Sequence, residues 1–142
     1  MPPAPKTLTI ERPRDDQAPA GEPKVELRGM GFHYPGRQAL ADINLAVPEH
    51  RVTAIVGPSG CGKSTLIKSI NRIAEIGTDV KVEGEVLFDG KNVYAPGTDL
   101  VDLRRRVGML FQKPNPFPKS IFENVAFGLR IHQGRMRSEL EA

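Results

Sequence analysis

The sequence predicts an α/β fold, and three neighbouring features carry that prediction. Residues 51–56 form a short apolar run with β-branched side chains, which is typical of a parallel strand buried on both faces of a sheet. A glycine-rich loop, residues 57–64, stops this run. From Lys63 onward, apolar residues recur at three- and four-residue spacing, which predicts a helix whose apolar stripe packs back on the sheet. The stripe consists of Leu66, Ile67, Ile70, Ile73 and Ala74.

The first 24 residues differ in composition from the rest of the chain. They contain six of the 13 prolines, and Leu8 and Ile10 are their only large aliphatic residues. Such a segment buries too little apolar surface to offset the entropy lost on ordering. We therefore expect residues 1–24 to be a disordered, proline-rich leader and residues 25–142 to form the folded part.

Two alternating runs begin the folded part. Val25 and Leu27 alternate with charged residues, and the run reaches the turn signal Pro35-Gly36. A second alternating run over residues 40–47 ends at Pro48. The pattern predicts a pair of antiparallel strands at the edge of the sheet.

A second hairpin and a short helix follow a break at Gly77. Residues 84–88 and 91–94 flank Asp89-Gly90, which is a strong hairpin signal. Thr98 or Asp99 can cap a short helix that runs through Arg106. An apolar strand over residues 107–111 is expected next.

The last part of the chain combines a proline-rich loop with a helix. Three prolines among residues 112–118 exclude regular structure but stiffen the loop. The capping box formed by Ser120 and Glu123 predicts the start of a helix. Its apolar face would consist of Ile121, Phe122, Val125 and Leu129. Residues 135–142 resemble the start of a further helix.

Composition excludes several classes of protein. The chain has 20 basic and 17 acidic residues, a net charge of +3, which argues against a dedicated nucleic-acid binder. Its single cysteine cannot form an intramolecular disulfide. It contains no apolar run of signal-peptide or membrane-span length, so we expect a cytosolic location.

Scattered charged and histidine side chains receive no functional role. Arg104, Arg105 and Arg106 could form a nucleic-acid or lipid patch, but a helix turns them to different faces and no aromatics are interleaved. We favour a solvated helix end stabilised by positive charge. The three histidines, His33, His50 and His132, lack the spacing of a metal site.

The loop between the predicted strand and helix fits the pattern G-x-x-x-x-G-K-[ST] of a phosphate-binding loop. It consists of Gly57, Pro58, Ser59, Gly60, Cys61, Gly62, Lys63 and Ser64. Glycines let backbone N–H groups approach phosphate oxygens, and the positive end of the helix dipole adds to the attraction. Lys63 would bind the β- and γ-phosphates of a nucleotide, and the Ser64 hydroxyl would ligate Mg²⁺. A glycine-rich turn without a ligand would explain the glycines but not the Lys-Ser pair.

Cys61 has two interpretations. A helix N-terminus lowers the pKa of a thiol, so Cys61 could be a redox switch. We favour a small residue whose backbone amide matters, because no second cysteine is present to resolve an oxidised one.

Four segments together resemble the nucleotide-binding subunits of ABC transporters: Tyr34, residues 57–65, residues 107–112 and residues 123–125. Residues 57–65 and 111–118 are most similar to the ATP-binding subunit of the bacterial phosphate-specific importer. The resemblance covers residues 25 to about 137. It implies an ABC-type P-loop NTPase with an antiparallel β region, of which this chain holds the N-terminal portion with the beginning of the helical subdomain.

The resemblance also implies roles for individual residues. Tyr34 would stack on the adenine ring, although a core tyrosine beside Phe32 is the alternative. Thr65 completes the ATP-binding loop. Gln112 would reach Mg²⁺ and the attacking water, so Ser64 and Gln112 are the candidate metal contacts, through ATP, and Lys63 and Gln112 would support catalysis. The proline-rich loop and the helix after Ser120 would receive a coupling helix of the permease.

The family's pattern continues with motifs that these 142 residues do not contain. They are a signature loop, the Mg²⁺-binding Asp, the catalytic Glu and a switch His. We therefore expect the chain by itself to be inactive, with no catalytic residue of its own beyond the supporting ones.

For the complete subunit, the resemblance implies ATP hydrolysis coupled to import of inorganic phosphate. Its partners would be a second copy of the ATPase subunit, the transmembrane permease subunits and, indirectly, an extracytoplasmic phosphate-binding protein. It would lie at the cytoplasmic face of the cell membrane as a peripheral protein. Two alternatives remain: the ATPase subunit of another ABC importer, such as one for amino acids, and a non-hydrolysing module that binds nucleotide or permease.

Overall fold

The computed structural model describes residues 22–133 of the chain. The chain divides into two compact units, Met1–Gly108 and Met109–Ala142. Most of the predicted leader and the predicted helix over residues 135–142 lie outside the described residues. No helix in the described part is long and apolar enough to cross a membrane.

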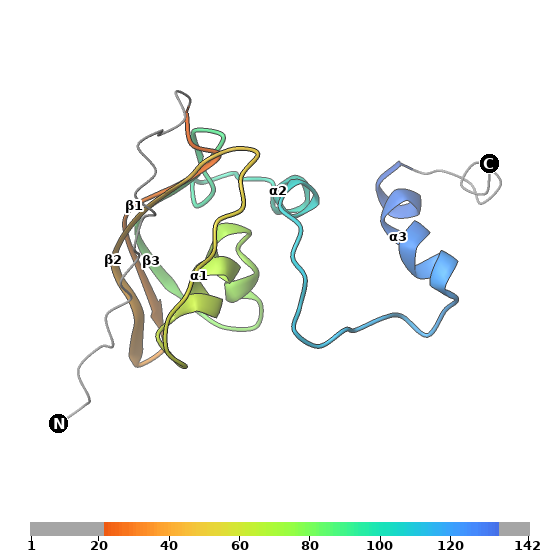
Figure 1. The fold of residues 1–142 in the computed structure, drawn as a ribbon, viewed down its shortest axis with the longest axis horizontal. Coiled ribbons are helices and arrows are strands. Elements are labelled where there is room, and N and C mark those ends of the chain that lie inside the picture. The colour runs from red at the N-terminus through yellow and green to blue at the C-terminus, as the bar shows by residue number, and fades with distance from the viewer. Residues whose placement is uncertain (1–21, 134–142) are drawn as a thin grey trace. The chain divides into compact units, whose positions relative to one another are not determined.

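An antiparallel sheet forms the body of the first unit, with its four strands in the order β2-β1-β3-β4. The strands are β1 (Val25–Tyr34), β2 (Arg37–Val47), β3 (Lys81–Phe88) and β4 (Lys91–Asn92). Figure 1 shows β1 between β2 and β3. Both predicted hairpins are confirmed, although β3 begins three residues earlier than expected and β4 ends two residues sooner.

The backbone of Lys24 is already bonded to this sheet one residue before β1 begins, although the sequence analysis placed Lys24 in the leader. Its backbone N–H donates to the Val47 carbonyl at 2.9 Å, and its carbonyl accepts from the Asp89 N–H at 3.1 Å. Its ammonium group pairs with Glu49 at 2.9 Å and with Asp89 at 2.8 Å. Ordered structure therefore starts before the predicted boundary.

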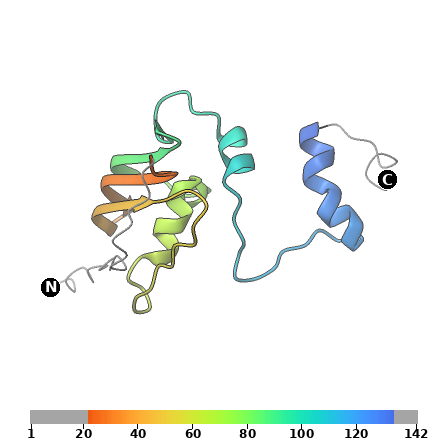
Figure 2. The ribbon, with the colours of Figure 1, turned by 45° about the horizontal axis from the view of Figure 1, so that its top comes forward.

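One face of the sheet is covered by helix α1 (Lys63–Ile70), as both views show (Figure 2). The fully buried side chains that meet there are Leu27, Met30, Phe32, Leu66 and Val86. The alternation read from the sequence accounts for Val25 and Leu27 of β1, because every second residue of a strand points to the same face. Met30 is buried after a shift of register between Leu27 and Met30, where Gly29 has a φ of 56°.

The predicted helix after Lys63 is shorter than its apolar stripe. Arg72 takes a left-handed conformation, with φ of 58°, and separates α1 from a 3₁₀ turn at Ile73–Glu75. Ala74 in that turn is buried, whereas Ile67 on α1 is 44% exposed. The stripe is therefore confirmed in part, and its last members belong to a second element.

The predicted central strand over residues 51–56 is wrong for this structure. Those residues form no strand, the Val52 side chain is 100% exposed and Val56 is 77% exposed. Only Ile55 packs against the core. A parallel strand is held by hydrogen bonds to neighbouring strands, and no described strand pairs with this segment.

The predicted strand over residues 107–111 is also wrong, for the same reason. Helix α2 (Leu100–Arg106) ends as expected, but the following residues are irregular and Leu110 is 99% exposed. The expected cap of α2 is confirmed at Asp99. Its carboxylate accepts from the Val101 N–H at 2.8 Å and from the Asp102 N–H at 3.1 Å.

The second unit consists of the proline-rich loop and helix α3 (Ile121–Gln133). The capping box is confirmed: the Ser120 hydroxyl accepts from the Glu123 N–H, and the Glu123 carboxylate accepts from the Ser120 N–H, both at 3.2 Å. The predicted apolar face is not a core, since Ile121, Val125 and Leu129 are exposed and Phe122 is half-buried. The packing that does occur joins the rings of Phe117 and Phe127, whose centroids lie 4.3 Å apart.

Candidate functional site

The glycine-rich loop has the backbone that its glycines predict. Gly60 and Gly62 have φ of 76° and 106°, a region that residues with a Cβ rarely adopt. Gly62 also lies against β2: a Cβ built on it would come within 2.7 Å of Leu40 Cδ2 and 3.1 Å of the Ala39 carbonyl oxygen. Glycine at position 62 therefore allows both the turn and its close contact with the sheet.

Lys63 folds back across the loop. Its ammonium group donates to the carbonyls of Gly57 at 2.8 Å and Pro58 at 2.7 Å. The same nitrogen lies 3.7 Å from Cys61 Sγ. A positive charge is thus held over the loop by neutral carbonyl partners, which are weaker acceptors for an ammonium than anionic oxygens are.

The N-terminus of α1 presents unused donors. No side chain caps this end, and the first turn contains no acidic residue. Within the described part of the chain, the first helical N–H with a partner is that of Leu66, which donates to the Gly62 carbonyl at 2.9 Å. The N–H groups of Lys63, Ser64 and Thr65 are left free, and the Ser64 side chain is exposed. Three free donors, a helix dipole and Lys63 form a site that fits an anion such as a phosphate group.

Cys61 is buried in the middle of the loop, with its side chain 2% exposed. Burial restricts access of oxidants to the thiol and argues against the redox-switch interpretation.

Comparison with known proteins identifies the family. A family model described as "ABC transporter" matches residues 40–142, which include the whole loop and all of α1. The chain belongs to the ABC transporter family. It is also similar to the solved structure of cbiO1 from Clostridium perfringens, which is part of the ABC transporter complex cbiONQ. Sequence identity is 30%, the TM-score is 0.68, and the match covers 85% of this chain and 47% of cbiO1.

These findings confirm the predicted fold class, an α/β P-loop NTPase of the ABC ATPase type with an antiparallel β region. The chain spans about half the length of the cbiO1 chain.

Tyr34 lies at the end of β1, and its aromatic ring contacts another. The ring meets Phe32 edge-on, with the centroids 5.1 Å apart and the planes inclined by 63°. This is the contact that the core-tyrosine alternative expects, and the side chain is half-buried. A role of Tyr34 in stacking on adenine stays a prediction.

Gln112 belongs to the second unit, in the irregular segment before the prolines. Its side chain is exposed. Its predicted contact with Mg²⁺ stays a prediction of the family resemblance.

Each of the three consecutive arginines has its own partner. Arg104 donates from Nη2 to the Arg72 carbonyl at 2.9 Å, Arg105 pairs with Asp102 at 2.6 Å, and Arg106 pairs with Asp89. The Arg106 guanidinium also lies over the Phe88 ring, 4.7 Å from its centroid. Arg105 and Arg106 keep exposed side chains, as the predicted solvated helix end requires, whereas Arg104 is partly buried; Arg104 and Arg106 also bind groups outside α2. Sequence reasoning missed these roles, and a triple-arginine run offers no signal for them.

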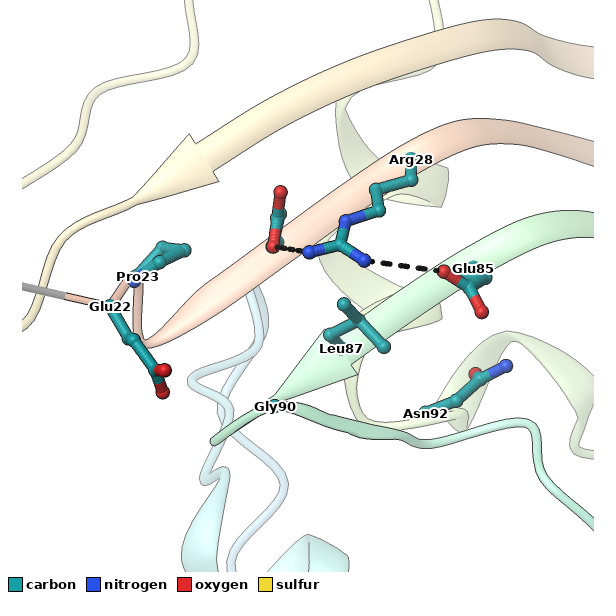
Figure 3. A pocket seen from close by; sticks show the side chains of 8 residues that line it. Glu22, Pro23, Arg28, Glu85, Leu87, Gly90 and Asn92 are labelled. Atoms are coloured by element: carbon teal, nitrogen blue, oxygen red, sulfur yellow. Dashed lines mark hydrogen bonds and ion pairs between the residues drawn. The ribbon is translucent and has the colours of Figure 1, made fainter.

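A hollow of about 380 Å³ lies on the other side of the sheet from α1 and shares no residue with the loop (Figure 3). Its lining consists of Glu22, Pro23, Glu26, Arg28, Glu85, Leu87, Gly90 and Asn92. Arg28 pairs with Glu26 at 2.7 Å and lies 3.7 Å from Glu85, and it holds the pKa of Glu26 below its usual range. Among the described residues no cluster of His, Cys, Asp or Glu could hold a metal ion. The hollow is thus an ion-paired surface, and the loop is the better candidate site.

Proposed function

We propose that the chain binds MgATP through residues 57–65, as the nucleotide-binding part of an ABC transporter ATPase. The observation that supports this most directly is the combination of the Lys63 ammonium with three free N–H donors at one end of α1. A triphosphate offers anionic oxygens to all four groups at once. The proposal extends to adenine stacking by Tyr34.

Different groups of the loop would bind different parts of MgATP. Lys63 would exchange its two carbonyl partners for oxygens of the β- and γ-phosphates, a favourable exchange because hydrogen bonds to anions are stronger. The first-turn N–H groups would hold a phosphate in place, and the Ser64 hydroxyl is available to Mg²⁺. When bound, Mg²⁺ neutralises charge on the β- and γ-phosphates. Gln112 is the second candidate contact to the metal.

Hydrolysis is proposed for the complete subunit and not for these 142 residues. They hold the phosphate cradle and one hydroxyl for the metal, but they lack the general base that the family's catalytic Glu supplies. In the complete subunit, a second copy and the permease subunits would be the partners, at the cytoplasmic face of the membrane.

We propose inorganic phosphate as the cargo, because residues 111–118 resemble those of the phosphate-specific importer subunit.

The same stretch of residues suits a stiff contact surface, because Asn124 of α3 binds it at Phe117. The Asn124 Oδ1 accepts from the Phe117 N–H at 2.8 Å, and its Nδ2 donates to the Phe117 carbonyl at 3.1 Å. The exposed apolar residues Ile121 and Val125 lie on the same helix. We propose that this surface receives the coupling helix of the permease.

A phosphate-binding loop like residues 57–65 would also suit an ABC ATPase that serves another cargo. The similarity to cbiO1, part of the complex cbiONQ, supports the ABC ATPase fold but not phosphate as cargo. Another ABC importer is therefore the second candidate, and a non-hydrolysing module that binds nucleotide is the third.

Nucleotide binding is tested by titrating MgATP into the 142-residue chain and into two lysine variants, with calorimetric detection. Lys63→Ala should lose binding by about 100-fold or more, because a charge-assisted contact to phosphate is removed. Lys68→Ala, on the same helix but outside the loop, is the matched control and should bind as the wild type does. Equal binding by wild type and Lys63→Ala would refute the proposed site.

Cargo is tested in cells by disrupting the gene that encodes the chain and measuring uptake of radiolabelled phosphate and of amino acids. Loss of phosphate uptake alone supports phosphate as cargo. Loss of amino-acid uptake with normal phosphate uptake would favour the second candidate. If both uptakes stay normal, the phosphate proposal fails and the non-hydrolysing module gains support.

A further inference from the structure

Phe32 is a core residue of β1 that lies beside the predicted adenine contact, Tyr34. Its side chain is 0% exposed, and its ring meets the Tyr34 ring edge-on, with the centroids 5.1 Å apart. In an edge-on pair, each ring covers at most one face of the other, so at least one face of Tyr34 stays free of Phe32. The Tyr34 side chain is only half-buried. Packing against the core and stacking on a base are therefore compatible for the same ring.

Leu40 connects Phe32 with the phosphate-binding loop. In the pairing of β1 with β2, Leu40 is the direct partner of Phe32, and such partners have Cβ atoms about 4.5–5.5 Å apart. Leu40 is also the side chain against which Gly62 lies, since a Cβ built on Gly62 would come within 2.7 Å of Leu40 Cδ2. Phe32 and Leu40 share the core of the first unit with Leu66 of α1. A continuous set of packed groups thus joins the loop to Tyr34 within one unit.

The sheet holds Tyr34 less firmly than the residues before it. Tyr34 is the last residue of β1 and pairs with Arg37 on β2, and within the described sheet it has no partner on β3. Phe32 and His33, in contrast, pair with residues on both neighbouring strands. A ring in a closely packed core has little freedom to move. The contact with the Phe32 ring therefore orients the Tyr34 side chain.

We propose that Phe32 is a positioning residue for nucleotide binding: its ring holds the Tyr34 ring in the place, relative to the phosphate-binding loop, that a nucleoside triphosphate requires. The proposal rests on the proposed function, in which Tyr34 stacks on adenine and the loop binds the phosphates. A base linked to a triphosphate gains from stacking only when both ends of the ligand fit at once. A ring that is ordered beforehand also loses less entropy on binding. Phe32 needs no contact of its own with the ligand.

The test removes the ring of Phe32 and keeps an apolar side chain. Phe32→Leu is the main variant, and Phe32→Ile, whose β-branched side chain suits a strand, serves if the leucine variant fails to fold. Phe88→Leu is the matched control, because Phe88 is a buried phenylalanine of β3 that pairs with Val25 at the other end of β1. Tyr34→Ala shows the effect of losing the stacking ring itself.

The first measurement compares the binding of ATP with that of inorganic tripolyphosphate, both with Mg²⁺, by calorimetry. The ratio of the tripolyphosphate dissociation constant to the ATP dissociation constant reports what the adenosine part contributes. This ratio should fall about tenfold in Tyr34→Ala, as loss of one stacked base predicts. It should fall about three- to tenfold in Phe32→Leu and stay at the wild-type value in Phe88→Leu. The affinity for tripolyphosphate itself should change by no more than about twofold in any variant.

The second measurement follows the Tyr34 ring without any ligand. The chain contains two tyrosines and no tryptophan, so a Tyr94→Phe background leaves Tyr34 as the only strong intrinsic fluorophore. Acrylamide should quench Tyr34 more strongly when Phe32→Leu is added to this background. Adding Phe88→Leu should leave the quenching unchanged.

Each outcome supports or overturns the proposal. A wild-type ratio in Phe32→Leu overturns it, even if the quenching of Tyr34 increases, because Phe32 then has a structural role only. An equal fall of the ratio in Phe88→Leu also overturns it, since the effect is then one of general stability. If Tyr34→Ala keeps the wild-type ratio, or if the wild type binds neither ligand, the proposed function fails first and the positioning role falls with it. A lower ratio in Tyr34→Ala and Phe32→Leu alone, with stronger quenching in Phe32→Leu, supports the proposal.

Discussion

Gly62 offers the sharpest test of how the loop is built, because two costs coincide there. Replacing it with alanine places a Cβ at φ of 106°, which costs about 1–2 kcal/mol in the left-handed region. The new methyl group would also lie 2.7 Å from Leu40 Cδ2, and Leu40 is buried in the core. Overpacking of a core costs about 1–3 kcal/mol. Gly62→Ala should therefore destabilise the first unit by about 2–5 kcal/mol.

Gly60→Ala separates the two costs. Gly60 also has a left-handed backbone, with φ of 76°, but a Cβ on it would meet nothing within 4 Å. Its expected cost is about 1–2 kcal/mol, from backbone conformation alone. Both substitutions stiffen the unfolded chain equally, so this offset cancels in the comparison. The difference between the variants, about 1–3 kcal/mol, measures the contact between loop and sheet.

Urea unfolding of the two variants and the wild type, followed by far-UV circular dichroism, gives the comparison. With a slope near 1–2 kcal/mol per molar urea, the unfolding midpoint of Gly62→Ala should lie about 0.5–3 M below that of Gly60→Ala. Equal midpoints would refute the close packing of Gly62 against Leu40. A lower midpoint for Gly60→Ala would refute the assignment of both costs.

Four further predictions follow from individual contacts. Asp99→Ala removes the cap of α2 and should cost about 1 kcal/mol in urea unfolding; an unchanged midpoint would show that the cap adds nothing. Lys24 holds the pKa of Asp89 below its usual range, so the stabilisation is complete above about pH 4 and is lost as pH falls through the folded-state pKa. The melting temperature of Asp89→Asn should accordingly fall less than that of the wild type on acidification below about pH 4, and parallel curves would contradict this. Gly84→Ala puts a Cβ 2.4 Å from two backbone carbonyl oxygens of β1 and should cost about 3 kcal/mol or more, whereas Gly97→Ala, with open space around it, should cost about 1–2 kcal/mol. The 142-residue chain should release no phosphate from ATP above background, and steady release abolished by Lys63→Ala would disprove that expectation.

The features that the sequence predicts well are local ones. The hairpin turns at Pro35-Gly36 and Asp89-Gly90, the Asp99 cap and the Ser120 capping box each depend on residues a few positions apart. Their chemistry can be read from the residue types, because only a few side chains adopt those turns or accept those hydrogen bonds. The left-handed turns at Gly60 and Gly62 belong to the same class, and binding of phosphate by their loop stays a prediction.

The contacts that could not be predicted join distant parts of the chain. Nothing in the sequence indicates that Asn71 reaches Val107, or that Arg104 binds the end of α1. An asparagine at the end of an apolar helix is ordinarily a solvent-exposed stop signal, and its burial depends on α2 being packed beside it. The same holds for Lys63. Its place in the loop predicts a contact with phosphate, but its hydrogen bonds to two carbonyls depend on the path of the loop backbone, which the sequence does not show.

The two wrong strand predictions have one cause: among the described residues, no strand pairs with either segment. Residues 51–56, expected to be a parallel strand, and residues 107–111, expected to be an apolar strand, are both irregular, whereas all four observed strands are antiparallel neighbours. An antiparallel partner can be supplied by the next strand along the chain, but a parallel partner needs a crossover and usually a distant segment. Apolar β-branched residues such as Val52 and Val56 are typical of a buried strand. Both side chains are exposed here, because no described strand pairs with their segment. Exposed β-branched runs of this kind offer unpaired backbone groups to any other strand, so their conformation depends on which neighbours are present, not on their own sequence.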